Sequence, residues 1–209
     1  MIVDLHVHTS ALSACSCLDP EDAVKRAKEI GLEGICFTEH CRLWPVSDLE
    51  RLSQKYELPV FGGMEVETRE GHMLVFGLST EIKELITAAE LRDLVDREGG
   101  AIIYAHPFRG FLMFSFGDLR LTVDEACGRP VFETVNAVEA LSGKSTRGEN
   151  DLALEVLKRL KIPGTGGSDA HSAGEVGRCV TIFKKRIDNI QDLVTCLKRG
   201  ECRAAYRGK

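Results

Sequence analysis

The sequence predicts a single-domain α/β protein, residues 1–209, whose parallel strands close into a barrel. Three observations support this. Short apolar runs alternate with helical patterns along almost the whole chain, as in βα units. The length suits a small α/β barrel, which has roughly 200–250 residues. No histidine lies on a predicted helix, and most follow a predicted strand. Because parallel strands of a barrel end at one face, where active sites form, this placement favours a barrel over a doubly wound sheet.

The composition is that of an ordinary globular protein. Hydrophobic residues make up 44% and charged residues 28%, and the formal net charge is −5. The acidic balance gives no support for a general nucleic-acid binder. No run approaches the ~18 apolar residues of a membrane span. The start MIVDLHVHTS lacks the basic residues of a signal peptide, so the sequence predicts a cytoplasmic protein with no membrane partner.

Eight cysteines are present, but nothing indicates disulfides. There is no CxxC pair and no secretory signal, so free thiols in a reducing compartment are expected. Cys36 and Cys179 lie in apolar runs and are predicted core residues. Cys15, Cys17 and Cys41 each lie close to a histidine in the sequence.

The elements of the first half follow from apolar runs and helix signals. Asp19 and Pro20 predict a helix start, and Gly31 predicts its end. Ser47 is the expected cap of a second helix. The predicted strands are 1–8, 32–38, 59–67 and 72–78, and the predicted helices are 20–30, 47–57 and 88–98.

The second half begins with a compact buried strand at 101–105. A long connection, 107–130, follows and contains Phe108, Phe111, Phe114 and Phe116, with a short helix at 122–127. We expect this connection either to cover the site, to pack into the core or to form an oligomer contact. The remaining strands are expected at 137–141, 162–167 and 179–183, and the remaining helices at 147–160 and 188–199.

The histidines predict a metal site, because imidazole is the commonest protein ligand for zinc and related ions. Residues two apart on a strand point the same way, so His6 and His8 can reach one ion. Asp4 shares their face and either orients a ligating ring or makes a strand-end hydrogen bond. The histidines expected at the site are His6, His8, His40, His72, His106 and His171.

Carboxylates accompany these histidines. Glu65 and Glu67 share one face of a predicted strand, and Asp169 precedes His171 by two residues after a glycine pair. Buried carboxylates without partners are costly, so bound cations or surface exposure must explain them. Together with the histidines, they make a metal site the simpler explanation.

Five motifs in order resemble those of the PHP family, the polymerase and histidinol phosphatase domain. The resemblance in order and spacing covers residues 1–185. The motifs read DLHVHT at 4–9, TEH at 38–40, GME at 63–65 followed by GH at 71–72, AHPFR at 105–109 and GSDAH at 167–171. The second motif more often reads TDH in the family.

The resemblance implies a distorted (β/α)7 TIM-like barrel that holds up to three divalent metals and hydrolyses phosphoesters. The expected ions are Zn, Mn or Fe, two to three in number. Carried over by motif, one metal is held by His6, His8, Glu65 and Asp169, a second by Glu65, His72 and His106, and a third by His40 and His171.

One departure affects the third metal. The family usually places a His or Asp a few residues after HxH, whereas Ser10–Cys17 contains neither. Either Cys15 or Cys17 replaces that ligand, which would favour zinc over manganese, or the loop carries buried thiols, the interpretation we favour.

Two divalent ions roughly 3.5–4 Å apart would generate a metal-bound hydroxide as the nucleophile for a phosphoester. Arg109 is the first candidate to bind the phosphate bidentately, with Arg42 and Arg178 next. The leaving-group acid is His171 or a metal-held water.

The sequence thus predicts a metal-dependent phosphoesterase acting on a small phosphorylated metabolite or nucleotide. The alternatives are a non-catalytic metal-binding PHP module and a metal-dependent nuclease. Nucleic acid is expected only as a substrate, because no basic stripe is present.

Overall fold

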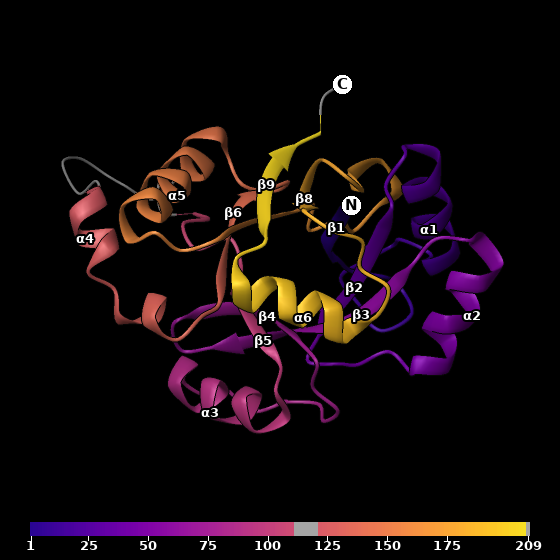
Figure 1. Cartoon of the computed structure of the whole chain (residues 1–209), viewed down its shortest axis with the longest axis horizontal. Coiled ribbons are helices and arrows are strands. Elements are labelled where there is room, and N and C mark those ends of the chain that lie inside the picture. Colours follow the sequence, from indigo (N-terminus) through magenta and orange to yellow (C-terminus); the bar gives the residue numbers. More distant parts are fainter. Residues whose placement is uncertain (111–120, 208–209) are drawn as a thin grey trace.

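The predicted α/β barrel is confirmed. The structure is a computed structural model that describes residues 1–110 and 121–207. Nine strands form one sheet in the order β7-β6-β5-β4-β3-β2-β1-β8-β9, and the sheet curls into a nearly closed barrel with helices around it (Figure 1). The described strands are β1 (Ile2–Val7), β2 (Gly34–His40), β3 (Val60–Thr68), β4 (Gly71–Phe76), β5 (Ala101–Tyr104), β6 (Ala137–Ser142), β7 (Gly164–Gly167), β8 (Cys179–Phe183) and β9 (Cys202–Tyr206).

Helices cover the barrel on its outside and at one end. Those with α-helical geometry are α1 (Pro20–Glu29), α2 (Val46–Tyr56), α3 (Ala88–Glu98), α4 (Val123–Cys127), α5 (Arg147–Leu160) and α6 (Ile190–Arg199). In Figure 1, α1 and α2 lie beside β2 and β3, while α4 and α5 lie at the opposite side of the barrel. Within the described part of the chain, no helix has the length and apolar character needed to cross a bilayer.

The sheet is mostly parallel, with two reversals that distort the barrel. The strands β1, β2 and β3 are parallel, as are β5, β6 and β7. Between these groups, β4 runs antiparallel to both neighbours. A parallel bridge between Val7 and Ala170 brings the first and last parallel strands together. On the other side of β1, β8 and β9 add an antiparallel pair.

Two kinds of apolar core hold this arrangement. Inside the barrel, Leu5, Leu74 and Ile103 pack with Leu193 and Leu197 of α6, which therefore plugs one end. Outside, separate clusters lie between the sheet and its helices, one with α1 and α2 and the other with α3, α4 and α5. The closed end leaves the opposite end of the barrel for a functional site.

Most predicted elements are present, with bounds that shift by up to two residues, as in β2 and β7, and with a few further differences. The predicted cap at Ser47 is wrong, because α2 begins at Val46 after Pro45 and has no side-chain cap. The last helix begins at Ile190, where Asn189 caps it, rather than at 188. The strand β9 was not predicted, because its sequence has no clear apolar alternation. In the 107–130 connection, Phe111, Phe114 and Phe116 lie outside the described residues, so the predicted roles of that loop stay predictions.

Asp4 makes strand-end hydrogen bonds. Its fully buried carboxylate accepts hydrogen bonds from the backbone N–H groups of Ser168 at 2.9 Å and Gly177 at 2.8 Å. A longer bond comes from the His6 N–H at 3.3 Å. The carboxylate therefore ties β1 to the segments after β7 and before β8, and the second interpretation of Asp4 is confirmed.

We expect Asp4→Asn to lower the free energy of unfolding by about 1–3 kcal/mol. An amide has one acceptor oxygen, so its NH2 group would face the N–H of Ser168 or Gly177. Urea titration checks this, with Asp22→Asn as the control because Asp22 forms an exposed ion pair with Lys25, and such surface pairs contribute little to stability. Equal stability of the two variants would contradict the assigned role of Asp4.

Candidate metal centre

All six histidines meet at the open end of the barrel, as predicted. His6 and His8 come from the end of β1, His40 from the end of β2, and His106 and His171 from the segments after β5 and β7. His72 is the second residue of β4. Because β4 is antiparallel to β3, its beginning lies beside the ends of the parallel strands, which explains why this histidine precedes its apolar run.

The buried carboxylate of Glu65 lies at the centre of this cluster, with 2% of its side chain exposed. One oxygen, Oε1, lies 3.0 Å from His72 Nδ1 and 3.2 Å from His106 Nε2. The other, Oε2, lies 3.2 Å from His8 Nε2 and 3.1 Å from His40 Nδ1. The two oxygens therefore divide these histidines into two sets.

Asp169 provides a second buried carboxylate beside the histidines. Its Oδ1 lies 3.3 Å from His8 Nε2 and 3.5 Å from His6 Nε2. Its Oδ2 accepts a hydrogen bond at 2.5 Å from the Nη2 group of Arg109, which also donates to the Ser142 hydroxyl at 3.0 Å. Asp169 thus joins the imidazoles to the predicted phosphate-binding arginine.

Glu139 is part of the centre and was missed in the sequence. Its Oε1 lies 3.0 Å from His6 Nδ1, and its Oε2 accepts the backbone N–H of His106 at 3.0 Å. The signal available was a glutamate in the middle of an otherwise apolar strand, AVEALS. The Glu139 oxygen accepts a hydrogen bond from His6 Nδ1, which orients the ring so that Nε2 faces the cluster.

The backbone near Glu139 has room only for glycine. A Cβ on Gly167 would lie 2.5 Å from Glu139 Oε1 and 2.5 Å from His6 Cβ. The glycine-rich end of β7 therefore lets His6 and Glu139 approach each other.

Strained backbone also marks the centre. Cys41, His106 and Asp169 have φ values of 54°, 28° and 52°, in the left-handed region that non-glycine residues seldom adopt. Among the described non-glycine residues, the other two with positive φ, Glu57 and Lys161, only end helices. Strain of this kind persists where the surroundings fix the conformation, and it gathers at functional sites.

The charges of the centre are strongly coupled. Burial opposes ionisation of Glu65, but the nearby rings of His6, His106 and His40 hold the pKa of this carboxyl well below its usual range. Burial likewise opposes a charge on His6, yet Glu139, Asp169 and Glu65 raise the pKa of its ring well above the usual value. The carboxyl group of Glu65 is therefore ionised, and the cluster favours positive charge beside it.

His171 differs from these histidines. Its Nδ1 lies 2.9 Å from the carbonyl oxygen of Asp169, which can only accept, so Nδ1 carries the proton. Burial, together with the neighbouring His8 and Lys144, lowers the pKa of the His171 ring. Its Nε2 therefore presents a lone pair at neutral pH.

The donor set fits divalent metals. His6 Nε2 and His8 Nε2 lie 3.1 Å apart and both face carboxylate oxygens. Such lone pairs repel one another unless a proton or a cation lies among them, and imidazole with carboxylate suits Zn, Mn or Fe. The described groups whose atoms can share one ion are His8, His40 and His171; His6, His8 and Asp169; His6, His106 and Glu139; and Glu65, His72 and His106.

The cysteines do not complete these groups. Among the described residues, no group of potential ligands contains a cysteine. The expectation of buried thiols is also wrong for Cys15 and Cys17, since both side chains are exposed. His8 instead joins His40 and His171 in the group that corresponds to the predicted third site. Cys36 and Cys179 are buried as predicted.

The three predicted arginines lie in different surroundings. Arg109 contacts Asp169 directly. Arg42 is half-exposed and pairs with Glu81 at 3.1 Å, so its described contacts lie outside the cluster. Arg178 lies 3.9 Å from Glu175, whose carboxylate accepts the backbone N–H of His171.

Comparisons with known proteins agree with this geometry. The profile of a family described as PHP-associated matches residues 147–202. An uncharacterized protein of Methanocaldococcus jannaschii, MJ1587, is 26% identical over 117 residues, which is 52% of this chain and 68% of that protein.

Two solved structures share the fold. PsfC from Pseudomonas syringae PB-5123 superposes with a TM-score of 0.68 at 20% identity, covering 99% of this chain and 91% of PsfC. A protein from Bifidobacterium adolescentis, described provisionally as a metal-dependent phosphoesterase, gives a TM-score of 0.67 at 13% identity, covering 93% of this chain and 96% of that protein. The resemblance to the PHP family is confirmed by the matched segment and this shared fold.

We expect Glu65→Gln to reduce bound metal from about two or more equivalents per chain to less than about one, because an amide is a poor replacement for a shared carboxylate. Elemental analysis after metal-supplemented purification measures this. Glu67→Gln is the matched control, since Glu67 lies two residues along β3 with an exposed side chain. An equal or larger loss at Glu67 would show that the central carboxylate is assigned wrongly.

Glu139→Gln should weaken metal binding about 10–100-fold, the usual effect of removing a partner that orients a ligating histidine. Gln has one acceptor oxygen and cannot serve both His6 Nδ1 and the His106 N–H. Competition with a chelating dye measures the affinity, and the absorption bands of cobalt-substituted protein report the ligand geometry. Glu155→Gln on the exposed face of α5 is the control. Unchanged affinity and bands would remove Glu139 from the centre.

Proposed function

We propose that this protein is a metal-dependent hydrolase that cleaves a phosphoester of a small phosphorylated metabolite or nucleotide. The observation that carries the proposal is the carboxylate of Glu65, which is shared between two sets of histidines at the open end of a barrel. A shared carboxylate of this kind sets the spacing of a two-metal centre.

The residues that would hold two to three Zn, Mn or Fe ions are His6, His8, His40, Glu65, His72, His106, Asp169 and His171. When bound, such ions supply Lewis-acid activation of water and neutralise charge on a phosphoryl group. Within this set, Glu139 orients the His6 ring so that Nε2 faces the cluster.

Arg109 would bind the phosphoryl group beside the metals. Its guanidinium is one-third exposed and touches Asp169 through Nη2. Among the described residues, its Nε is buried without a hydrogen-bond partner. The exposed part of the guanidinium is open to a phosphoryl group, and a guanidinium recognises phosphate through two parallel hydrogen bonds.

His171 would act as a ligand rather than as the acid that protonates the leaving group. Its Nδ1–H is engaged by the carbonyl of Asp169, and its lowered pKa disfavours a proton on Nε2. A neutral ring offers a lone pair, which is what a metal requires. Protonation of the leaving group would then come from solvent.

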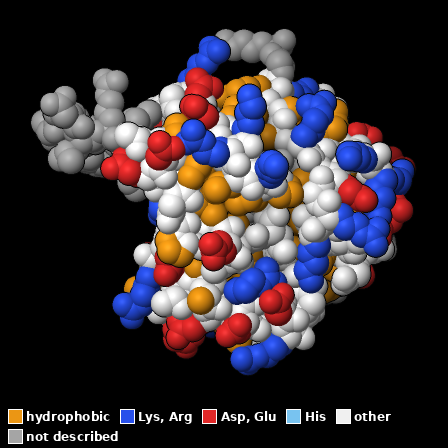
Figure 2. Space-filling model, turned by 60° about the vertical axis from the view of Figure 1, so that its left-hand side comes forward, with side chains coloured by type: hydrophobic (Ala, Val, Ile, Leu, Met, Phe, Trp, Pro, Cys, Tyr) orange, Lys and Arg blue, Asp and Glu red, His pale blue; other side chains and the backbone are white. Residues whose placement is uncertain are grey.

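The face drawn in Figure 2 has a mixed charge pattern. On the described face in Figure 2, lysine and arginine side chains alternate with aspartate and glutamate, and hydrophobic side chains lie among them. A nucleic-acid channel instead requires a continuous basic track.

The direct test combines elemental analysis with a hydrolysis screen of the metal-loaded protein over phosphorylated metabolites and nucleotides. Single- and double-stranded oligonucleotides form a separate arm for the nuclease alternative. Metal-dependent release of phosphate from a small substrate supports the proposal. A fully metallated protein that hydrolyses no phosphoester would favour the non-catalytic binding module.

Arg109→Ala should reduce kcat/KM about 10–1000-fold, on the order of 1.4–4 kcal/mol of transition-state stabilisation. Arg109→Lys should recover only part of this loss, because an ammonium cannot make the forked contact. Metal content is measured in parallel, since Arg109 also contacts Asp169. Turnover equal to the parent's would place phosphate recognition elsewhere, with Arg178 and Arg42 the next to test.

A further inference from the structure

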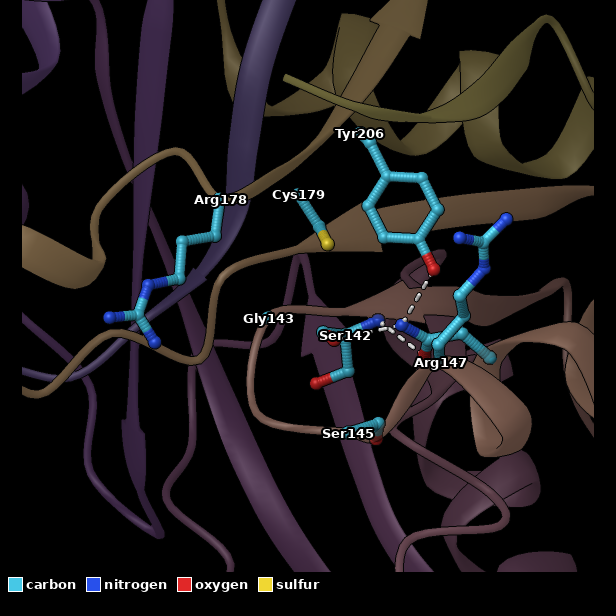
Figure 3. A pocket seen from close by; sticks show the side chains of 8 residues that line it. Ser142, Gly143, Ser145, Arg147, Arg178, Cys179 and Tyr206 are labelled. Carbon is cyan, nitrogen blue, oxygen red and sulfur yellow. Dashed lines mark hydrogen bonds between the residues drawn. The ribbon is translucent and has the colours of Figure 1, made fainter. Parts of the chain in front are cut away.

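A cavity of about 400 Å³ lies beside the metal centre, outside the cluster of histidines. It is formed by the segment that joins β6 to α5, by the residues that begin β8 and by the end of β9. Figure 3 shows Arg178 and Arg147 on opposite sides of this cavity, with the ring of Tyr206 between them and Ser145 below. The function proposed above does not use this space.

The cavity shares a wall with the metal centre. Ser142 lines the cavity, and its hydroxyl accepts the hydrogen bond from Arg109. The next residue, Gly143, packs so closely on the segment before Asp169 that a Cβ would lie 2.5 Å from the carbonyl oxygen of Ser168. A molecule bound at the metals could therefore extend over one loop into the cavity.

The inner wall is rigid and its polar groups are already paired. The side-chain amide of Asn150 donates to the Ser142 carbonyl at 3.1 Å and to the Tyr206 hydroxyl at 3.1 Å. Its oxygen accepts the Ser142 N–H at 3.1 Å. Asn150 thus holds the ring of Tyr206 in place, so the cavity is formed before any ligand binds.

The two guanidinium groups, in contrast, have weak partners. Arg178 lies 3.9 Å from Glu175 and Arg147 lies 3.9 Å from Asp151, both beyond hydrogen-bond distance. Among the described residues, no hydrogen bond engages either guanidinium, so their donors are available to a ligand. Both arginines line the cavity, with 52% of the Arg178 side chain and 91% of the Arg147 side chain exposed, so an anion held in the cavity would meet two guanidinium groups at its rim.

The cavity is suited to binding rather than to a second reaction. Its thiol, that of Cys179, is buried, and burial raises the pKa of this thiol to about 12. A neutral thiol is a poor nucleophile. The groups that remain are hydrogen-bond donors and an aromatic wall.

We propose that this cavity is an anion subsite, which binds a second negatively charged group, carboxylate or phosphate, at the non-reacting end of the substrate through Arg178 and Arg147. The inference rests on the proposed phosphoesterase function, which it extends by specifying a substrate with two anionic groups. Ser145 and the first turn of α5 also line the cavity. The N-terminal end of a helix favours a negative charge beside it.

The test uses the metal-loaded protein and matched series of alkyl phosphonates, in which the phosphonate replaces the reacting phosphate. The tethers have about two to six methylenes and end in methyl, carboxylate or a second phosphonate. Calorimetry gives each Kd without requiring turnover. We expect a charged end to tighten binding about 10–100-fold at one tether length or more, relative to methyl. The carboxylate and phosphonate ends distinguish the two anion types.

Arg178→Gln and Arg147→Gln, singly and together, should remove this gain, which is the ratio of the Kd values of the methyl-ended and charged compounds measured on the same variant. Arg186→Gln is the control, because Arg186 is exposed and its ion pair among the described residues is with Asp188. The subsite is overturned if charged ends bind no tighter at any length, if the double variant keeps the gain, or if the control loses as much.

Hydrolysis of the corresponding methyl-ended alkyl phosphates is measured separately on the parent. If they are hydrolysed while charged ends give no tighter binding, the proposed function stands and the subsite fails. If no phosphate is hydrolysed but the charged ends still bind tightly through the two arginines, the phosphoesterase proposal fails and the anion site stands.

Discussion

The burial of one carboxylate, that of Glu65, is the constraint on which the site depends. A buried ionised carboxylate is costly unless positive or hydrogen-bonding groups surround it. Here the surrounding groups are imidazoles from four different segments, including His40 at the end of β2, His72 at the start of β4 and His106 after β5. The reversal of β4 is what brings His72 to Glu65, so the distortion of the barrel and the composition of the site have the same cause.

A second set of contacts holds two further carboxylates, those of Glu139 and Asp169, beside the histidines. Gly167 leaves space for Glu139 to hold His6, and Asp169 adopts a left-handed backbone conformation that directs its carboxylate to His8. The same carboxylate anchors Arg109, whose other contact is Ser142. Ser142 therefore connects the histidine cluster with the neighbouring cavity, which it also lines.

Local sequence patterns predicted much of the fold. Alternating apolar runs and cap residues such as Asp19 gave the order of strands and helices, because burial and capping act over a few residues. The missing cap at Ser47 and the unpredicted β9 show the limit of such patterns. An edge strand such as β9 forms because a partner strand is available, and its own residues carry little signal of that.

For the site, the sequence by itself determined the residue types and their placement at strand ends: six histidines, Glu65 and Asp169, in an order that resembles PHP proteins. Which atoms meet was decided only by the tertiary structure, because contacts across the barrel join residues far apart in the chain. Glu139 reaches His6 across 133 residues, and Asn150 reaches Tyr206 across 56. The exposure of Cys15, the outward pairing of Arg42 and the cavity beside Arg178 likewise depend on how the loops pack.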